Sequence, residues 1–131
     1  MKKDVIVISL GGSLIIPDDV DGRFLSEFKK VLKKNSKKYK FVVVCGGGSL
    51  ARKYIRAIES QGHGHVLQSL AGINATRANA RFMSYFFGED SRRGIPHSFF
   101  RVKRELRKKD VVFCGALEYK PNQTSDSTSA D

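Results

Sequence analysis

Glycines follow each of three short apolar segments in this sequence. The segments are residues 5–10, 41–45 and 111–114, and the glycines that follow them are Gly11 and Gly12, Gly46 to Gly48, and Gly115. A strand that runs through glycines into a helix brings unhindered backbone N–H groups to the positive end of the helix dipole, where phosphate binds. The pattern therefore favours the binding and transfer of phosphate groups.

The second of these glycine runs precedes a segment with a helical pattern that starts near Ser49. If Ser49 caps that helix, Arg52 lies in its first turn and can hold the same anion with its guanidinium group. A tight turn would need one glycine, so three in a row favour phosphate binding over a turn. On this interpretation, Gly47→Val should abolish nucleotide binding and leave the fold intact.

Two common phosphate motifs fit less well. The string GGGSLA at residues 46–51 matches the dinucleotide pattern G-x-G-x-x-A, which also requires an acid about 20 residues further on. No Asp or Glu lies between Glu59 and Glu89, so this match is weak. The sequence also contains no G-x-x-x-x-G-K-[ST] motif, which argues against P-loop chemistry.

The glycines are positioned by strands that alternate with helices. Residues 5–10 form a short, β-branched segment that predicts a buried strand, and residues 41–45 and 111–114 predict two more strands. Helices are expected at residues 21–35, 49–61, 66–87 and 99–108. This alternation predicts an α/β fold with a parallel sheet, whose ligands bind beyond the carboxyl ends of the strands.

Size and charge fit a single domain that binds anions. The chain has 131 residues, with 24 Lys and Arg against 13 Asp and Glu, which gives a net charge of +11. This excess attracts nucleotides, nucleic acids or acidic membranes without choosing among them. The basic segment 101–109 is interpreted as a solvated amphipathic helix, so we do not expect nucleic acid to be a partner.

The two cysteines, Cys45 and Cys114, each end an apolar segment and share no C-x-x-C spacing. They are interpreted as buried free thiols in a reducing, cytoplasmic compartment. No apolar stretch reaches the roughly 18 residues that a membrane span needs, and we expect no membrane partner. His63 and His65 have no Cys or carboxylate nearby, so no metal site made of protein ligands is predicted.

Four motifs, in this order, resemble the amino acid kinase family, and most closely its archaeal-type uridylate kinases. They are VISLGGSLI at 7–15, VVVCGGGSLARKYI at 42–55, LAGINATRANA at 70–80 and QTSD at 123–126. The resemblance implies a three-layer α/β/α sandwich with a mainly parallel sheet, of which residues 1–131 form the N-terminal, UMP-side part. It implies phosphoryl transfer from ATP to UMP in pyrimidine nucleotide synthesis, with Mg²⁺ as cofactor and a homohexamer as the assembly.

The resemblance also assigns roles to individual residues of this sequence. Gly12 and Asp126 match catalytic positions, with the aspartate organising the basic groups and the metal. Positions on the ATP side are Gly11, Gly12, Ser13, Gly48 and Arg52. Positions on the UMP side are Gly47, Gly72, Thr76 and Thr124.

The sequence departs from the family pattern at several points. Ser69 stands where an aspartate usually holds the UMP ribose, Ser9 stands where the wider family often has a lysine, and Ala116 replaces the second glycine of a phosphate loop. The family domain also continues well past residue 131, so this chain resembles a truncated form, and we expect no catalysis from it alone. The alternative is a noncatalytic nucleotide- or nucleic-acid-binding remnant of the family.

Overall fold

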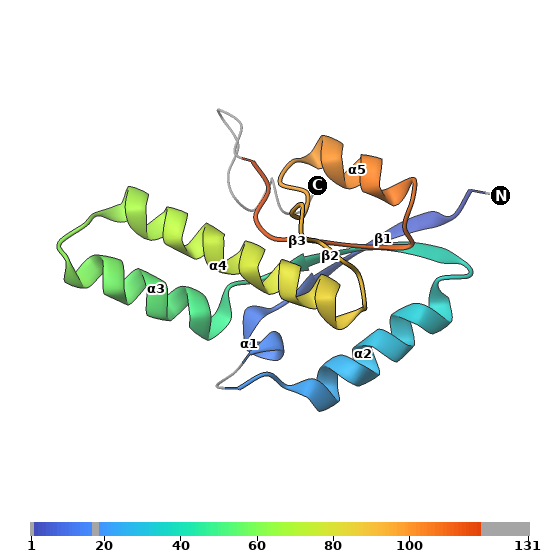
Figure 1. The fold of residues 1–131 in the computed structure, drawn as a ribbon, viewed down its shortest axis with the longest axis horizontal. Helices are drawn as coiled ribbons and strands as arrows, with labels where there is room; N and C mark the ends of the chain where they lie inside the picture. Colours follow the sequence, from blue (N-terminus) through green and yellow to red (C-terminus); the bar gives the residue numbers. More distant parts are fainter. Residues whose placement is uncertain (1, 17–18, 119–131) are drawn as a thin grey trace.

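The computed structural model describes residues 2–16 and 19–118. Strands and helices alternate along the chain, as the sequence predicts (Figure 1). Their order is β1 (Asp4–Leu10), α1 (Gly12–Ile15), α2 (Gly22–Asn35), β2 (Tyr39–Cys45), α3 (Gly48–Ser60), α4 (His65–Phe86), α5 (Phe99–Leu106) and β3 (Val111–Cys114). The sequence did not predict α1, a single helical turn that follows β1 directly.

The three strands form one parallel sheet in the order β1-β2-β3. The register pairs Leu10 with Cys45, and Val44 with Cys114, so the last residues of all three strands lie at the same edge. The predicted convergence of the three strand ends is therefore confirmed. The glycines that follow the strands begin at this edge, which we call the carboxyl edge.

Helices cover both faces of the sheet, which makes three layers (Figure 1). On β2, Phe41, Val43 and Cys45 share a core with residues of α2 and α4. The alternate residue Val42 faces α5 and packs in a second cluster with Val102. The helix α3 packs against α4 and extends the layer on that side. The predicted α/β/α arrangement is confirmed.

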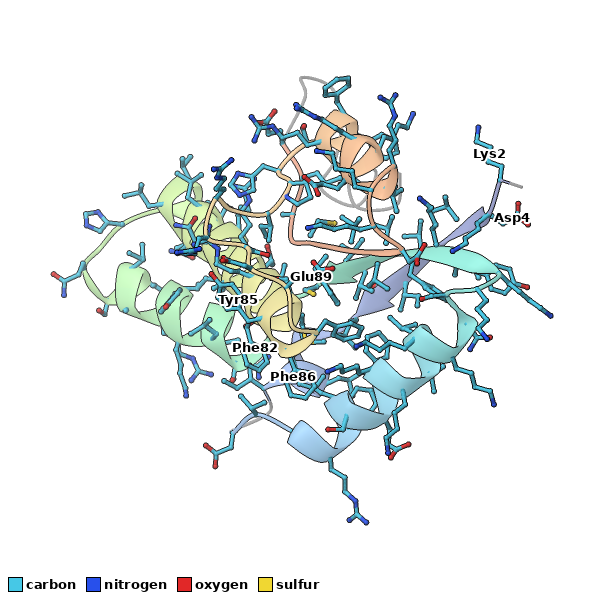
Figure 2. All side chains as sticks on the ribbon, turned by 45° about the vertical axis from the view of Figure 1, so that its right-hand side comes forward. Lys2, Asp4, Phe82, Tyr85, Phe86 and Glu89 are labelled. Atoms are coloured by element: carbon cyan, nitrogen blue, oxygen red, sulfur yellow. The ribbon has the colours of Figure 1, made fainter. Side chains whose placement is uncertain are left out.

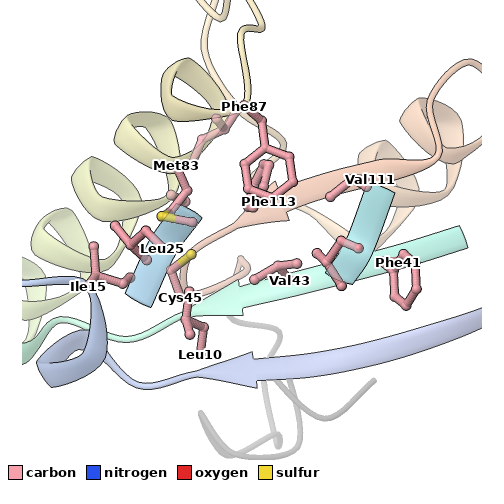
Figure 3. Packing of buried hydrophobic residues seen from close by; sticks show 13 residues of the cluster. Leu10, Ile15, Leu25, Phe41, Val43, Cys45, Met83, Phe87, Val111 and Phe113 are labelled. Carbon is pink, nitrogen blue, oxygen red and sulfur yellow. The ribbon is translucent and has the colours of Figure 1, made fainter. Parts of the chain in front are cut away.

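The larger core lies between the sheet and the helices α2 and α4 (Figure 3). Leu25 of α2 and Met83 of α4 are fully buried there, and burying such a side chain contributes about 1.5–3 kcal/mol. The ring of Phe87 packs edge-on against Phe113 of β3, with ring centroids 4.8 Å apart. These contacts anchor the end of α4 to the sheet and thereby fix the position of the rest of that helix.

The strand β1 is less buried than predicted. Val5 and Val7 are 50% and 47% exposed, and only Leu10 at the end of the strand is buried. In the described part of the chain β1 pairs with β2 alone, and apolar β-branched composition does not distinguish an edge strand from a central one. The prediction of a buried strand is therefore wrong for most of β1.

Candidate phosphate-binding site

The loops that follow β1 and β2 are joined directly through their backbones. The N–H of Gly46 donates to the carbonyl of Leu10 at 2.9 Å, which continues the ladder of the sheet one residue past Cys45. Beyond this bond, the first loop turns into α1 and the second into α3. The two glycine runs therefore meet at the carboxyl edge, as the phosphate hypothesis requires.

Contact between these loops leaves no room for side chains. A Cβ on Gly12 would overlap the backbone nitrogen of Gly48 and lie 2.6 Å from its Cα. A Cβ on Gly46 would lie 2.9 Å from the nitrogen of Gly12. Gly48 also has a φ of +56°, a conformation that L side chains rarely adopt. Loop-to-loop packing therefore requires these glycines whether or not a phosphate binds.

Gly47 is also restricted by its own surroundings. A Cβ on this residue would overlap the Cβ of Ala51 and lie 3.7 Å from the Cβ of Ala75. The expectation that Gly47→Val leaves the fold intact is therefore corrected, because a branched side chain here displaces the first turn of α3. The argument that a mere turn would need only one glycine also fails, since close packing uses all three.

The start of α3 has no side-chain cap, in contrast to the starts of α2 and α5. The Asp21 side chain accepts from the N–H of Phe24 and caps α2, and the Ser98 side chain accepts from the N–H of Arg101 and caps α5. The N-cap of α3 is Gly47, and no side chain caps it. The first N–H groups of an α-helix have no partner within the helix, so at the carboxyl edge they are available to an anion.

Three further observations bear on the start of α3. The helix α4 also lacks a side-chain cap, but it begins at Gly64 in an exposed turn, where water can serve its N–H groups. Ser49 does not cap α3 as expected; its hydroxyl donates to the carbonyl of Ile16 at 3.0 Å and ties α3 to the end of α1. Arg52 is exposed and lies five residues after the N-cap, in the second turn of α3 and not in the first turn as expected.

A buried asparagine on α4 holds the second glycine loop in place. Asn79 is 5% exposed, and its side-chain amide donates to the carbonyls of Gly46 and Gly47 at 2.8 and 3.2 Å. These bonds turn the two carbonyls toward α4, away from the position of an anion at the start of α3. Asn79 lies in the motif at residues 70–80, but this role was not predicted from the sequence. A buried polar residue within an Ala-rich helix was the available signal.

Thr76, predicted on the UMP side, contacts the loop that follows β3. Its hydroxyl accepts from the N–H of Ala116 at 2.9 Å and donates to the carbonyl of Ile73 at 2.7 Å. The neighbouring Arg77 donates to the carbonyl of Ala116 at 3.2 Å. A Cβ on Gly115 would lie 2.7 Å from the nitrogen of Arg77. The third strand end is thereby held against α4, and among the described residues one acceptor site of the Thr76 hydroxyl has no donor.

The remaining predicted residues fall in three places. Gly11 and Ser13 are exposed beside the buried Gly12 in the first loop. Gly72 lies on α4 where that helix meets α3, and a Cβ on it would lie 3.4 Å from Ile55 Cδ1. Thr124 and Asp126 lie outside the described residues. The structure therefore brings together the loops of Gly11 to Ser13 and Gly46 to Gly48 with Thr76, while Gly72 lies in a helix contact.

The two cysteines directly precede the carboxyl edge and are buried and free. Burial raises the pKa of the Cys114 thiol to about 11. Burial, and to a smaller extent the Cys114 charge, raises the pKa of Cys45 well above the usual range for a thiol. Both side chains are therefore neutral at physiological pH, and a neutral thiol is a poor nucleophile. These residues pack the ends of the strands and do not supply covalent chemistry.

The donor set at the carboxyl edge does not fit a resident Mg²⁺ ion. Mg²⁺ in proteins is held by one or two carboxylates together with phosphate oxygens and water. None of the residues 11–13, 46–48 and 115–116 carries a carboxylate. The predicted acid, Asp126, lies outside the described residues. The described residues therefore supply N–H and hydroxyl groups to an anion and no ligand for a cation.

A parallel sheet with helices on both faces and glycine loops at one edge defines an α/β/α domain. Residues 4–128 match the model of the amino acid kinase family. The chain belongs to the amino acid kinase family.

Individual relatives agree with this assignment. The chain is 36% identical over 126 residues to uridylate kinase of Methanosarcina barkeri, covering 96% of this chain and 53% of the relative. It is 32% identical over 125 residues to uridylate kinase of Thermococcus onnurineus, covering 95% of this chain and 55% of the relative. The chain thus spans about half the length of these relatives.

Two solved structures share the fold. The crystal structure of uridylate kinase from Archaeoglobus fulgidus matches with a TM-score of 0.76 and 30% identity, over 97% of this chain and 56% of that one. The structure of UMP kinase from Ureaplasma parvum matches with a TM-score of 0.75 over 99% of this chain and 61% of that one. At 22% identity, the second likeness concerns the fold alone.

Proposed function

We propose that this chain is the UMP-side part of a nucleoside monophosphate kinase that transfers a phosphoryl group from ATP to UMP. The observation that carries the proposal is the uncapped start of α3, which meets the loop after β1 at the carboxyl edge. The similarity to relatives named uridylate kinase supports UMP as the acceptor. Both lines of support concern the half of the domain that this chain spans.

In the proposed mechanism, backbone N–H groups provide most of the contacts to the phosphates. An oxygen of the UMP phosphate attacks the γ-phosphorus of ATP, and the bond to the β,γ-bridging oxygen breaks, which yields UDP and ADP. The chain positions the two phosphates in line, and N–H groups neutralise the developing charge without a covalent intermediate. Gly11, Gly12, Ser13, Gly48 and Arg52 would line the ATP phosphates.

The acceptor lies on the other side of the α3 start in this proposal. Gly47, Gly72, Thr76 and Thr124 would face UMP, and Asp126 would organise the basic groups. For Thr76 the support is its position beside the loop after β3 and its free acceptor site. Gly72 would act less directly, because its open side faces Ile55 of α3.

Isothermal titration calorimetry with UMP and with uridine tests the proposal. We expect UMP to bind measurably and uridine at least about tenfold more weakly, because charge-assisted hydrogen bonds to phosphate contribute about 1.5–3 kcal/mol. Arg52→Ala should weaken binding of a nonhydrolysable ATP analogue by a similar factor. Arg56→Ala, which removes an exposed arginine one turn further along α3, is the matched control. Equal affinities for UMP and uridine would overturn the proposal.

A noncatalytic nucleotide-binding role is the second candidate, and Ser69 favours it. This serine stands where we expect an aspartate for the ribose, and the change removes a charged acceptor from the acceptor side. An assay for ATP-dependent UDP formation can exclude this second candidate. We expect no turnover above background from the 131-residue chain alone. Measurable turnover would exclude the noncatalytic role.

The proposal includes a cytoplasmic location and a homo-oligomer, for which the family hexamer is the expected form. Two free buried thiols support a reducing compartment. In the described part of the chain, no helix is long and apolar enough to cross a membrane. Light scattering of the purified chain measures the oligomer directly.

A further inference from the structure

Each of the three strands begins directly after a run of basic residues. Lys2 and Lys3 precede β1, Lys37 and Lys38 precede β2 with Lys40 as its second residue, and residues 107–109 (Arg-Lys-Lys) lead to β3. These eight residues are a third of the 24 Lys and Arg of the whole chain. Because the strands are parallel, all three runs lie at one edge of the sheet, opposite the carboxyl edge. We call these eight residues the basic edge.

The figures show the same grouping. In Figure 1, the N-terminus, the connection from α2 to β2 and the connection from α5 to β3 all lie on the right-hand side. The start of α3 and the end of β1 lie on the opposite side of the sheet in the same view. Figure 2 labels Lys2 and Asp4 at the exposed start of β1, away from the aromatic residues of α4. The basic edge is therefore a surface separate from the candidate phosphate site.

The basic edge surrounds a hollow of about 610 Å³. Its floor includes the apolar side chains of Val5 and Leu106, and its only carboxylate is that of Asp110. The cations that line it come from all three runs and from α5, and they are Lys2, Lys3, Lys40, Lys103 and Arg107. Five cations and one carboxylate around a hollow of this size produce a strongly positive local potential.

Some of these cations have protein partners. Lys3 forms an ion pair with Asp110 at 2.9 Å, Lys109 lies 3.4 Å from both Glu89 and Glu105, and Lys40 donates to the carbonyl of Leu106. The rest are exposed and, within the described ranges, have no carboxylate at ion-pair distance, namely Lys2, Lys37, Lys38, Arg107 and Lys108. A polyanion could therefore bind these cations without displacing a carboxylate of the described residues.

We propose that the basic edge binds the sugar-phosphate backbone of a single-stranded nucleic acid. Within the described ranges, the cations without an ion-pair partner are spread over the three segments that lead into the strands, which suits an extended polyanion better than one small phosphate. The apolar side chains in the lining of the hollow offer a surface to an unstacked base, which a single strand can supply more readily than a duplex. This partner was not expected from the sequence, where only the segment 101–109 was weighed as a nucleic-acid surface, because the fold alone shows that the basic runs meet at one edge.

Contacts of this kind are made to phosphate groups and do not depend on the base sequence. We therefore expect a dissociation constant of about 10⁻⁴–10⁻⁶ M at physiological salt that weakens steeply as salt rises. Fluorescence anisotropy with a labelled oligouridylate of about 20 nucleotides measures it, a length that exceeds the roughly 4–16 nucleotides covered by an OB fold, another small single-strand-binding domain. A test variant takes one cation from each run: Lys2→Glu, Lys38→Glu and Arg107→Glu.

The control variant carries Arg23→Glu, Lys53→Glu and Arg56→Glu, three exposed cations on α2 and α3 with the same change in net charge. We expect the edge variant to bind at least about tenfold more weakly, with a salt slope reduced by about 2, and the control to stay within about threefold of the parent. Equal losses of affinity in the two variants would show that binding depends on net charge alone, and this would overturn the proposal.

A second variant and two competing ligands complete the experiment. If the edge variant fails to fold by circular dichroism, glutamine at the same three positions removes the charge without reversing it, and the same loss is expected. Vesicles containing anionic lipid and a duplex of the same length are tested in parallel. Binding of either that is tighter than binding of the single strand, and sensitive to the edge variant, would contradict the proposed partner.

Discussion

Gly12 and Gly48 lie in backbone contact, so closely that a Cβ on Gly12 would be 2.6 Å from the Cα of Gly48. These residues belong to the loops after β1 and β2 and start two different helices. Their contact fixes the first N–H groups of α3 relative to the first loop. A phosphate that binds at this point would therefore meet a site that is already formed and would not need to order a flexible loop.

Gly12→Ala should destabilise the fold, because the added methyl group meets backbone atoms that cannot move independently. We expect a loss of about 1–3 kcal/mol in the free energy of unfolding, the usual cost of overpacking. Urea unfolding followed by circular dichroism measures it. Gly22→Ala is the matched control, since a Cβ on Gly22 meets nothing within 4 Å. An equal effect of both variants would mean that the loops separate easily.

Asn79→Ala should loosen the second glycine loop. The change removes the two hydrogen bonds to the carbonyls of Gly46 and Gly47, and each buried polar group left without a partner costs about 1–3 kcal/mol. Asn79→Asp should be worse, because a carboxylate would face two carbonyl oxygens. UMP affinity should fall in both variants.

The control for this prediction is Asn35→Ala. Asn35 donates a comparable side-chain bond, to the carbonyl of Val31 at 2.8 Å, but in an exposed position at the end of α2. Water can replace that bond, so we expect a change of less than about 0.5 kcal/mol. A result in which Asn35→Ala and Asn79→Ala cost the same would remove the special role of Asn79.

The sequence predicted the elements and the shared edge of the glycines, because alternating strands and helices allow few arrangements. It did not predict why the glycines are there. The contact between Gly12 and Gly48 joins residues far apart in the chain, and only the folded sheet brings them together. The sequence favoured phosphate over a tight turn as the reason for bare backbone, whereas the structure adds packing as a sufficient reason of its own.

The exposure of β1 and the hydrogen bond of Ser49 also differ from the expectation because they depend on tertiary contacts. Val5 and Val7 are typical of a buried strand, yet their exposure depends on which elements lie beside β1. Ser49 resembles a capping residue, yet its hydroxyl bonds to Ile16 across a loop contact. Local patterns indicate the type of an element, and tertiary neighbours decide what each of its faces contacts.

The stability of the chain should fall as pH rises from about 8.5 to 11. Burial raises the pKa of Cys114 to about 11, whereas a thiol in the unfolded chain titrates at about 8.5. Between these values the unfolded state has released a proton that the folded state still holds, so the linkage favours unfolding. The stabilising contribution is complete below about pH 8.5 and disappears as pH passes the folded value.

Urea unfolding at several pH values checks this prediction. Because Lys and Tyr side chains also titrate in this range, the comparison is with the variant Cys45→Ala and Cys114→Ala. We expect that variant to lose less stability between pH 8.5 and 11 than the parent. Identical pH dependence of the two proteins would show that the thiols are not protected by burial.

The central claim is that phosphate binds where α3 starts against the loop after β1. Nuclear magnetic resonance of the ¹⁵N-labelled chain tests it most directly, with UMP and uridine titrated separately. We predict that UMP shifts the amide signals of residues 11–13 and 46–50, that uridine leaves them nearly unchanged, and that residues 107–110 at the opposite edge do not respond. Equal shifts with uridine, or UMP shifts confined to other parts of the chain, would contradict the account.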